Sequence, residues 1–215
     1  MARLQVKICG LSTPETVAAA VAGGAAYVGF VFFPPSPRCV PAARAAELAA
    51  DVRPGVCKVG LFVEPDDALL EETLAAAPLD MIQLHGEESP ERVEQVRALT
   101  GLPVMKAVAI ATADDLPRLS AYEDVADQLL CDAKPVEGSD LPGGNGVVFD
   151  WRLIAGRRWR KPWMLAGGLT PENVAEAARL TGAAQVDVSS GVESAPGVKD
   201  IARIKAFLAA AKGAD

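Results

Sequence analysis

The first unit of the chain reads Leu4-Gln5-Val6-Lys7-Ile8-Cys9-Gly10-Leu11-Ser12-Thr13-Pro14-Glu15. Apolar residues alternate with polar ones from Leu4 to Ile8, which is typical of a β-strand. The run Ser12-Thr13-Pro14-Glu15 is a typical helix start, because a hydroxyl caps the first turn and proline fits its first position. A strand that leads so quickly into a helix predicts a βα unit, with Cys9 at the carboxyl end of the strand.

The same unit recurs along the whole chain. β-rich runs predict strands at residues 4–8, 27–32, 56–62, 81–84, 104–108, 128–131, 162–165 and 185–188. Segments with helical spacing predict helices at residues 14–22, 42–52, 66–76, 90–100, 114–120, 150–156, 171–180 and 198–212. Strands separated by helices pair in parallel through right-handed crossovers. Eight such units predict an α/β fold, a (β/α)8 TIM barrel formed by residues 1–215 as a single domain.

The alternative fold is an open doubly wound sheet. It is less favoured, because the glycine-rich fingerprint that binds dinucleotides is missing after the first strand.

The composition of the chain disfavours several classes of function. The chain has 215 residues, a formal net charge of −7 and 50% hydrophobic residues, which fits one large domain without a clustered basic face for nucleic acid. No uninterrupted apolar run is long enough to span a membrane, and the first ten residues contain no secretion signal. The four cysteines lack zinc spacing. We therefore expect a cytoplasmic enzyme, monomeric, without a metal and acting on a small molecule.

Two residues at strand ends form a candidate acid/base pair. Side chains at the carboxyl ends of barrel strands face the active site. The Cys9 thiol can be ionised there and act as a base, although most free cysteines are simply small buried hydrophobes. Asp132 directly follows the sixth predicted strand, at the same rim, with a loop or capping carboxylate as the alternative. Two titratable groups that face one substrate are typical of an isomerisation.

Three further residues are expected at the same rim. Asp187 interrupts the apolar run of the last strand, so its carboxylate must face the mouth or find a partner. Arg38 follows a proline-rich loop and can bind a carboxylate with two hydrogen bonds, although a lone arginine is more commonly solvated. His85 follows the fourth strand as a substrate contact or, alternatively, as a packing or capping residue.

Glycine-rich junctions follow the last two strands, where barrels commonly bind phosphate through backbone N–H groups. Plain turns are the alternative. The long irregular segment 132–149 contains a third glycine cluster and has the length of an active-site cover. The candidate phosphate-binding residues are Gly144, Gly146, Gly167, Gly168, Ser189, Ser190 and Gly191.

With these motifs in place the chain resembles the phosphoribosylanthranilate isomerase family of tryptophan biosynthesis from residue 4 to about 208. One departure is Asn145, where the family often has threonine. The matching stretches are residues 7–10, 29–32, 36–38, 83–86, 132, 143–146, 149–151, 166–169, 186–193 and 197–200.

The resemblance implies an Amadori rearrangement of N-(5-phosphoribosyl)anthranilate to 1-(2-carboxyphenylamino)-1-deoxyribulose 5-phosphate, without a cofactor. It implies Cys9 as the general base, Asp132 as the general acid, Arg38 as the partner of the anthranilate carboxylate, and Asp187 as a partner of the sugar hydroxyls. The glycine-rich junctions would bind the phosphate.

Two kinds of alternative function remain. One is a phosphosugar-binding barrel without catalysis, which intact Cys9 and Asp132 disfavour. The other is a related phosphosugar isomerase, epimerase or synthase. Such epimerases use paired aspartates with a metal and such synthases use a rim lysine, and neither pattern is apparent in this sequence. The analogous isomerase of histidine synthesis typically uses two aspartates. Cys9 favours the tryptophan route.

Overall fold

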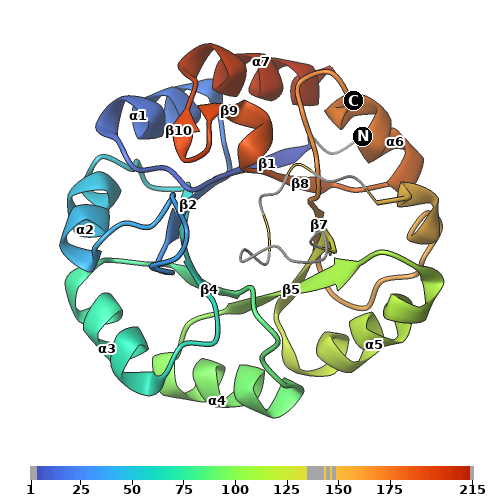
Figure 1. Ribbon diagram of the computed structural model, residues 1–215, viewed down its shortest axis with the longest axis horizontal. Helices are drawn as coiled ribbons and strands as arrows, with labels where there is room; N and C mark the ends of the chain where they lie inside the picture. Colours follow the sequence, from blue (N-terminus) through green and yellow to red (C-terminus); the bar gives the residue numbers. More distant parts are fainter. Residues whose placement is uncertain (1–3, 135–142, 144–145, 147–148, 214–215) are drawn as a thin grey trace.

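The computed structural model describes residues 4–134, 143, 146 and 149–213 of the chain. Eight parallel strands pair in chain order and close into a barrel, as predicted (Figure 1). Each strand lies within a residue or two of its expected range. The strands are β1 Gln5–Cys9, β2 Tyr27–Val31, β3 Cys57–Phe62, β4 Met81–Leu84, β5 Val104–Ile110, β6 Gln128–Ala133, β7 Trp163–Leu165 and β8 Gln185–Val188.

The α-helices surround the ring of strands (Figure 1). Side-chain caps begin several of them where the sequence predicts a start; for example, Thr13 accepts a hydrogen bond from the N–H of Thr16, and Ser89 accepts one from Arg92. None of the described helices is long and apolar enough to cross a membrane. The helices are α1 Pro14–Gly23, α2 Ala42–Ala50, α3 Asp67–Ala76, α4 Pro90–Thr100, α5 Leu116–Val125, α6 Val174–Thr181 and α7 Ile201–Lys212. Short 3-10 turns occur at η1 Ala113–Asp115, η2 Trp151–Leu153 and η3 Ser190–Val192.

The prediction of an α-helix over residues 150–156 is wrong, because only η2 forms there. Asp150 caps this turn by accepting from the N–H of Arg152, and Gly156 adopts a left-handed backbone with φ of 72°. The described part of the chain therefore has a single 3-10 turn between β6 and β7.

Helices α6 and α7 each begin three residues later than predicted. Residues 171–173 form a turn before α6, because the side chain of Asn173 accepts from the N–H of Thr170 and donates to the carbonyl of Gly168. Residues 198–199 are not helical; they form strand β10 (Val198–Lys199), which pairs with β9 (Glu193–Ala195) in a hairpin before α7.

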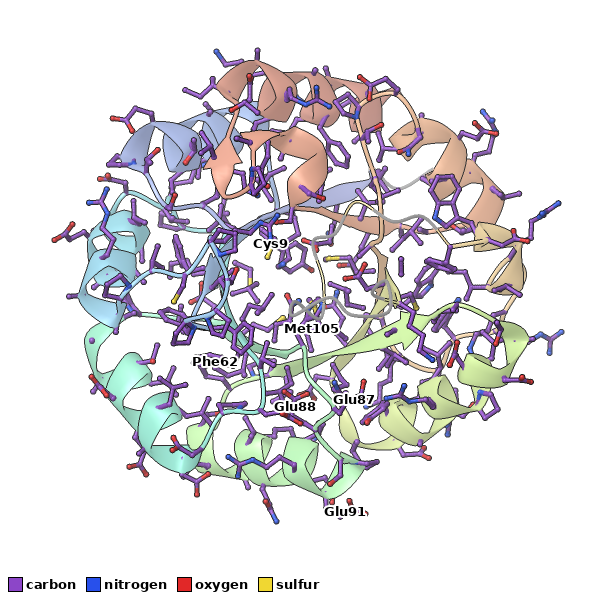
Figure 2. The ribbon with its side chains drawn as sticks, viewed as in Figure 1. Cys9, Phe62, Glu87, Glu88, Glu91 and Met105 are labelled. Atoms are coloured by element: carbon purple, nitrogen blue, oxygen red, sulfur yellow. The ribbon has the colours of Figure 1, made fainter. Side chains whose placement is uncertain are left out.

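Side chains fill the barrel at its amino end and in its middle, so that a site can form only at the carboxyl ends of the strands. At the amino end, the Gln185 side-chain oxygen accepts from the Tyr27 hydroxyl at 2.9 Å and from the Gln128 amide at 3.0 Å. Above this polar layer, Met105 and other apolar side chains fill the inside of the ring (Figure 2). Core filling below and loops above are what the fold requires for a site at the strand ends. The inner apolar cluster is Met105, Ala107, Leu130, Met164 and Ala166.

Candidate active site

A cavity of about 780 Å³ of empty space, part of it open to solvent, lies at the carboxyl ends of the strands. Figure 2 shows Cys9 on the inner side of the ring of strands. Apolar side chains such as Phe33 and Leu61 cover part of the wall. Gly144 lies outside the described residues, and every other predicted site residue lines the cavity: Cys9, Arg38, His85, Asp132, Gly146, Gly167, Gly168, Asp187, Ser189, Ser190 and Gly191.

Cys9 is the last residue of β1 and is 3% exposed. Gly29 of β2 lies beside it in register, and a Cβ added to Gly29 would stand 3.0 Å from the Cys9 sulfur. Only glycine leaves room for the thiol at this position. Burial raises the pKa of Cys9 above its ordinary value, while the ammonium groups of Lys7 and Lys199 act to lower it. Burial outweighs the two ammonium groups, and the net effect is a raised pKa.

Asp132 lies within β6, one residue before its end, rather than after it. Its Oδ1 accepts from the N–H of Ala133 at 2.8 Å, and its Oδ2 lies 3.1 Å from Nε2 of His85. Nδ1 of His85 lies 2.7 Å from Nε2 of Gln83. The His85 ring therefore links the Gln83 amide on one side to the Asp132 carboxylate on the other. The hydrogen bonds fix the orientation of this carboxylate inside the cavity.

Gln83 was not among the predicted site residues, although a polar residue inside the apolar run of β4 could have pointed to it. Its Oε1 is buried and has no hydrogen-bond partner in the described part of the chain. Gly143 packs against the His85–Asp132 pair. A Cβ at Gly143 would lie 2.5 Å from Nε2 of His85 and 2.9 Å from Oδ2 of Asp132, so the main chain passes directly over the pair.

Asp187 both faces the mouth and has a partner, the two outcomes expected of it. It lines the cavity, and its Oδ1 lies 2.9 Å from Nζ of Lys7. The two residues are direct register partners on β8 and β1. Sequence reasoning missed Lys7; a lysine inside the alternating pattern of a barrel strand was the available signal.

Arg38 is buried rather than solvated. Its Nε and Nη2 donate to the two carboxylate oxygens of Glu193 at 2.8 and 2.9 Å. Burial acts to raise the pKa of Glu193, but the hydrogen bonds from Arg38 and Lys199 prevail and lower it. Glu193 therefore fixes the plane of the guanidinium at the wall of the cavity. Neither Glu193 nor Lys199 was predicted as a site residue. Both lie in the β9–β10 hairpin, where the sequence predicts a loop followed by a helix.

The loops after β7 and β8 form another part of the cavity wall. Gly167 and Gly168 have positive φ angles of 84° and 63°, which turn the main chain sharply toward the cavity. The Ser189 carbonyl and hydroxyl are fixed by Nζ of Lys199 at 2.9 and 3.1 Å. Backbone N–H groups and hydroxyls of this kind suit an anion. In the described part of the chain, no group of three or more His, Cys, Asp or Glu side chains is placed to hold a metal ion.

A thiol, a carboxylate and glycine-rich loops around one cavity of a (β/α)8 barrel define a class, the barrel enzymes that act on small phosphorylated substrates. A family model described as N-(5′-phosphoribosyl)anthranilate (PRA) isomerase matches residues 6–210. The chain therefore belongs to the N-(5′-phosphoribosyl)anthranilate isomerase family, and it is an isomerase.

Relatives of this family are similar over nearly the whole chain. The N-(5′-phosphoribosyl)anthranilate isomerase of Paracoccus denitrificans is 65% identical over 208 residues, covering 97% of both chains. The one of Cereibacter sphaeroides is 63% identical over 212 residues, covering 99% of this chain and all of its own.

Solved structures agree with this assignment. The phosphoribosyl anthranilate isomerase of Thermotoga maritima superposes with a TM-score of 0.88 at 37% identity, covering 98% of this chain and 99% of its own. A phosphoribosyl anthranilate isomerase in complex with reduced 1-(o-carboxyphenylamino)-1-deoxyribulose 5-phosphate superposes with a TM-score of 0.85 at 35% identity and the same coverage.

Proposed function

We propose that this protein catalyses the Amadori rearrangement of N-(5-phosphoribosyl)anthranilate to 1-(2-carboxyphenylamino)-1-deoxyribulose 5-phosphate in tryptophan biosynthesis. One observation carries the proposal. A thiol on β1 and a carboxylate on β6 line the same cavity as the glycine-rich loops after β7 and β8. An acid, a base and an anion site around one substrate are what this rearrangement requires.

The reaction follows from the two titratable groups. Asp132 donates a proton to the furanose ring oxygen, and the ring opens to give an iminium ion. The iminium withdraws electrons from C2′, so that Cys9, as the thiolate, can remove the C2′ proton. The enolamine then takes up a proton at C1′ while its C2′ hydroxyl becomes the ketone. A positive iminium beside Cys9 also favours the thiolate over the thiol.

The remaining cavity residues hold the substrate. Arg38 binds the anthranilate carboxylate through its guanidinium, which Glu193 keeps in one plane. Asp187 accepts from the sugar hydroxyls, and His85 contacts the substrate beside Asp132. The phosphate is bound by backbone and hydroxyl groups of the glycine-rich loops, which include Gly144, Gly146, Gly167, Gly168, Ser189, Ser190 and Gly191. The substrate amine supplies the electron sink, so we propose a reaction without metal or cofactor.

The decisive test is a fluorescence assay that follows consumption of the anthranilate adduct by the purified protein. We expect multiple turnovers without added metal or cofactor, also after treatment with EDTA. A protein that binds 1-(2-carboxyphenylamino)-1-deoxyribulose 5-phosphate but shows no turnover would instead be a phosphosugar-binding barrel, and the proposed activity would be wrong.

Replacing Arg38 by alanine is expected to raise KM at least about tenfold, with a smaller change in kcat. A charge-assisted hydrogen bond contributes roughly 1.5–3 kcal/mol, and this contact holds ground state and transition state alike. Glu193 keeps Lys199 as a partner at 2.6 Å, so the variant leaves no unpaired buried carboxylate. The control is Arg44→Ala, an exposed arginine of α2 paired with Glu47, which should leave KM unchanged. An unchanged KM in Arg38→Ala would exclude the carboxylate contact.

We also propose that the protein is a monomer and works in the cytoplasm. All four cysteines are free, which suits a reducing compartment. The exposed large apolar side chains in the described residues, Leu99, Leu180, Val198 and Ile201, lie on several elements of the surface. Light scattering should give the mass of one chain, and a mass of two chains at micromolar concentration would contradict the monomer.

A further inference from the structure

Three ionisable groups meet on the inner face of β1 and β8. Lys7 and Cys9 lie two residues apart on β1, so their side chains point to the same side of the strand. Both converge on Gly29 of β2: a Cβ placed there would stand 3.0 Å from the Cys9 sulfur and 3.3 Å from Nζ of Lys7. Asp187, the register partner of Lys7, accepts from the same Nζ at 2.9 Å.

The burial of Lys7 is unusual for a lysine. Its side chain is 0% exposed, and Asp187 is the carboxylate that pairs with it. A buried ammonium requires compensation, and a lysine–carboxylate pair is often no more stabilising than apolar residues of the same size. The proposed reaction gives Asp187 a contact with the sugar but leaves Lys7 without a role. A fully buried cation next to the proposed base can change the stability of the thiolate, and this effect gives Lys7 a role.

We propose that Lys7 is a positioning residue whose ammonium stabilises the thiolate of Cys9, and that Asp187 limits this stabilisation by drawing the ammonium to itself. This inference rests on the proposed function, since it assigns the group that makes Cys9 a base. Asp187 is thereby given a second role beside its contact with the substrate. When the sugar hydroxyls engage Asp187, less of its charge opposes the thiolate, and the base becomes active on the bound substrate.

The charges around Cys9 agree with this arrangement. Lys7 and Lys199 lower the pKa of the thiol and Asp187 raises it, against a background of burial that raises it further. Burial acts to lower the pKa of Lys7, but the negative charges of Asp187 and Cys9 have the larger effect and raise it. Lys7 therefore stays charged. On the opposite side of the cavity, Asp132 and His85 are paired with each other. The groups that set the charge state of Cys9 therefore belong to β1, β8 and β10.

The alternative is a purely structural ion pair, and the chain offers a matched example. Lys106 of β5 is 1% exposed and pairs with Glu88 at 2.9 Å, the same separation as in the Lys7 pair. Its ammonium also donates to the carbonyls of Gly86, which follows β4, and of Ala107 within β5. Lys106→Met removes a buried, paired lysine away from the Cys9 cluster.

The experiment measures the pH dependence of Cys9 alkylation by iodoacetamide in the ligand-free protein, read by mass spectrometry of the Cys9 peptide. Only the thiolate reacts. In Lys7→Met we expect the midpoint to move to higher pH and the rate at pH 7.5 to fall about tenfold, the lower end of what an opposite charge at this range contributes. In Asp187→Asn we expect the midpoint to move to lower pH and the rate to rise. Lys106→Met should leave the midpoint unchanged.

Midpoints that move in the same direction in Lys7→Met and Asp187→Asn, or that do not move, would overturn the proposal. If Lys7→Met does not fold because Asp187 is left unpaired, the double variant Lys7→Met/Asp187→Asn removes both charges. Its midpoint should lie above that of Asp187→Asn alone, and equality of the two would overturn the proposal as well. The readout needs no substrate, so it is independent of the wild-type turnover assay that decides the proposed activity.

Discussion

Cys9→Ala is expected to lower kcat by about a hundredfold to ten-thousandfold, the usual contribution of a general base. Alanine leaves the strand and the cavity wall intact but cannot accept the C2′ proton. The variant should still bind the reduced product analogue, because the groups proposed to hold the carboxylate and the phosphate are unchanged. Steady-state turnover and calorimetric binding measured on the same preparation separate the two effects.

The control for this variant is Cys57→Ala at the amino end of β3, outside the cavity. It removes the same thiol and should keep wild-type kcat. Turnover in Cys9→Ala that equals that of Cys57→Ala would refute the role of Cys9 as the base.

The pH dependence of proton removal alone gives the sign of the effect. A base acts only after it has lost its proton, and burial raises the pKa of Cys9. Turnover also requires the proton of Asp132, whereas exchange of the C2′ proton of a ring-opened substrate analogue into heavy water requires only the base. The second-order rate constant of this exchange should therefore increase from neutral into alkaline pH, and the exchange should be absent in Cys9→Ala. A rate constant that is flat across this range in the wild type would show that another group is the base.

The barrel could be predicted from local pattern because each βα unit carries its own period and its own helix start. The strand ends followed directly, and with them the positions of Cys9, Asp132 and Asp187 on one rim. The pattern failed where the chain departs from that repeat. Residues 150–156 have the composition of a short helix, but the Asp150 cap and the left-handed Gly156 limit them to one 3-10 turn.

The partners of the site residues could not be predicted, because they are set by closure of the ring. Lys7 meets Asp187 across 180 residues of sequence; the predicted barrel makes the first and last strands neighbours, but it does not say which of their residues are register partners. Arg38 meets Glu193 across 155 residues in the same way. Gln83 was overlooked for a different reason: within a four-residue strand, its inward direction depends on the register, which apolar pattern alone does not fix.

Asp132→Asn is the second variant with a large expected effect. Asparagine has nearly the same shape, but its amide is not acidic and cannot transfer a proton to the ring oxygen. We expect kcat to fall about a hundredfold to ten-thousandfold, with KM changed much less. The control at the other end of the same strand is Asp127→Asn, whose carboxylate accepts from the N–H of Val104 outside the cavity. That variant should lose some stability but keep its turnover.

A substrate analogue that is already ring-opened separates the acid from the base. Asp132 acts before the ring opens and Cys9 acts after it, so exchange of the C2′ proton of such an analogue into heavy water should need Cys9 but not Asp132. We expect Asp132→Asn to exchange this proton at a rate close to that of the wild type, while Cys9→Ala does not exchange it. If both variants lost exchange equally, Asp132 would be needed for proton removal itself, and the division of the two roles between β6 and β1 would be wrong.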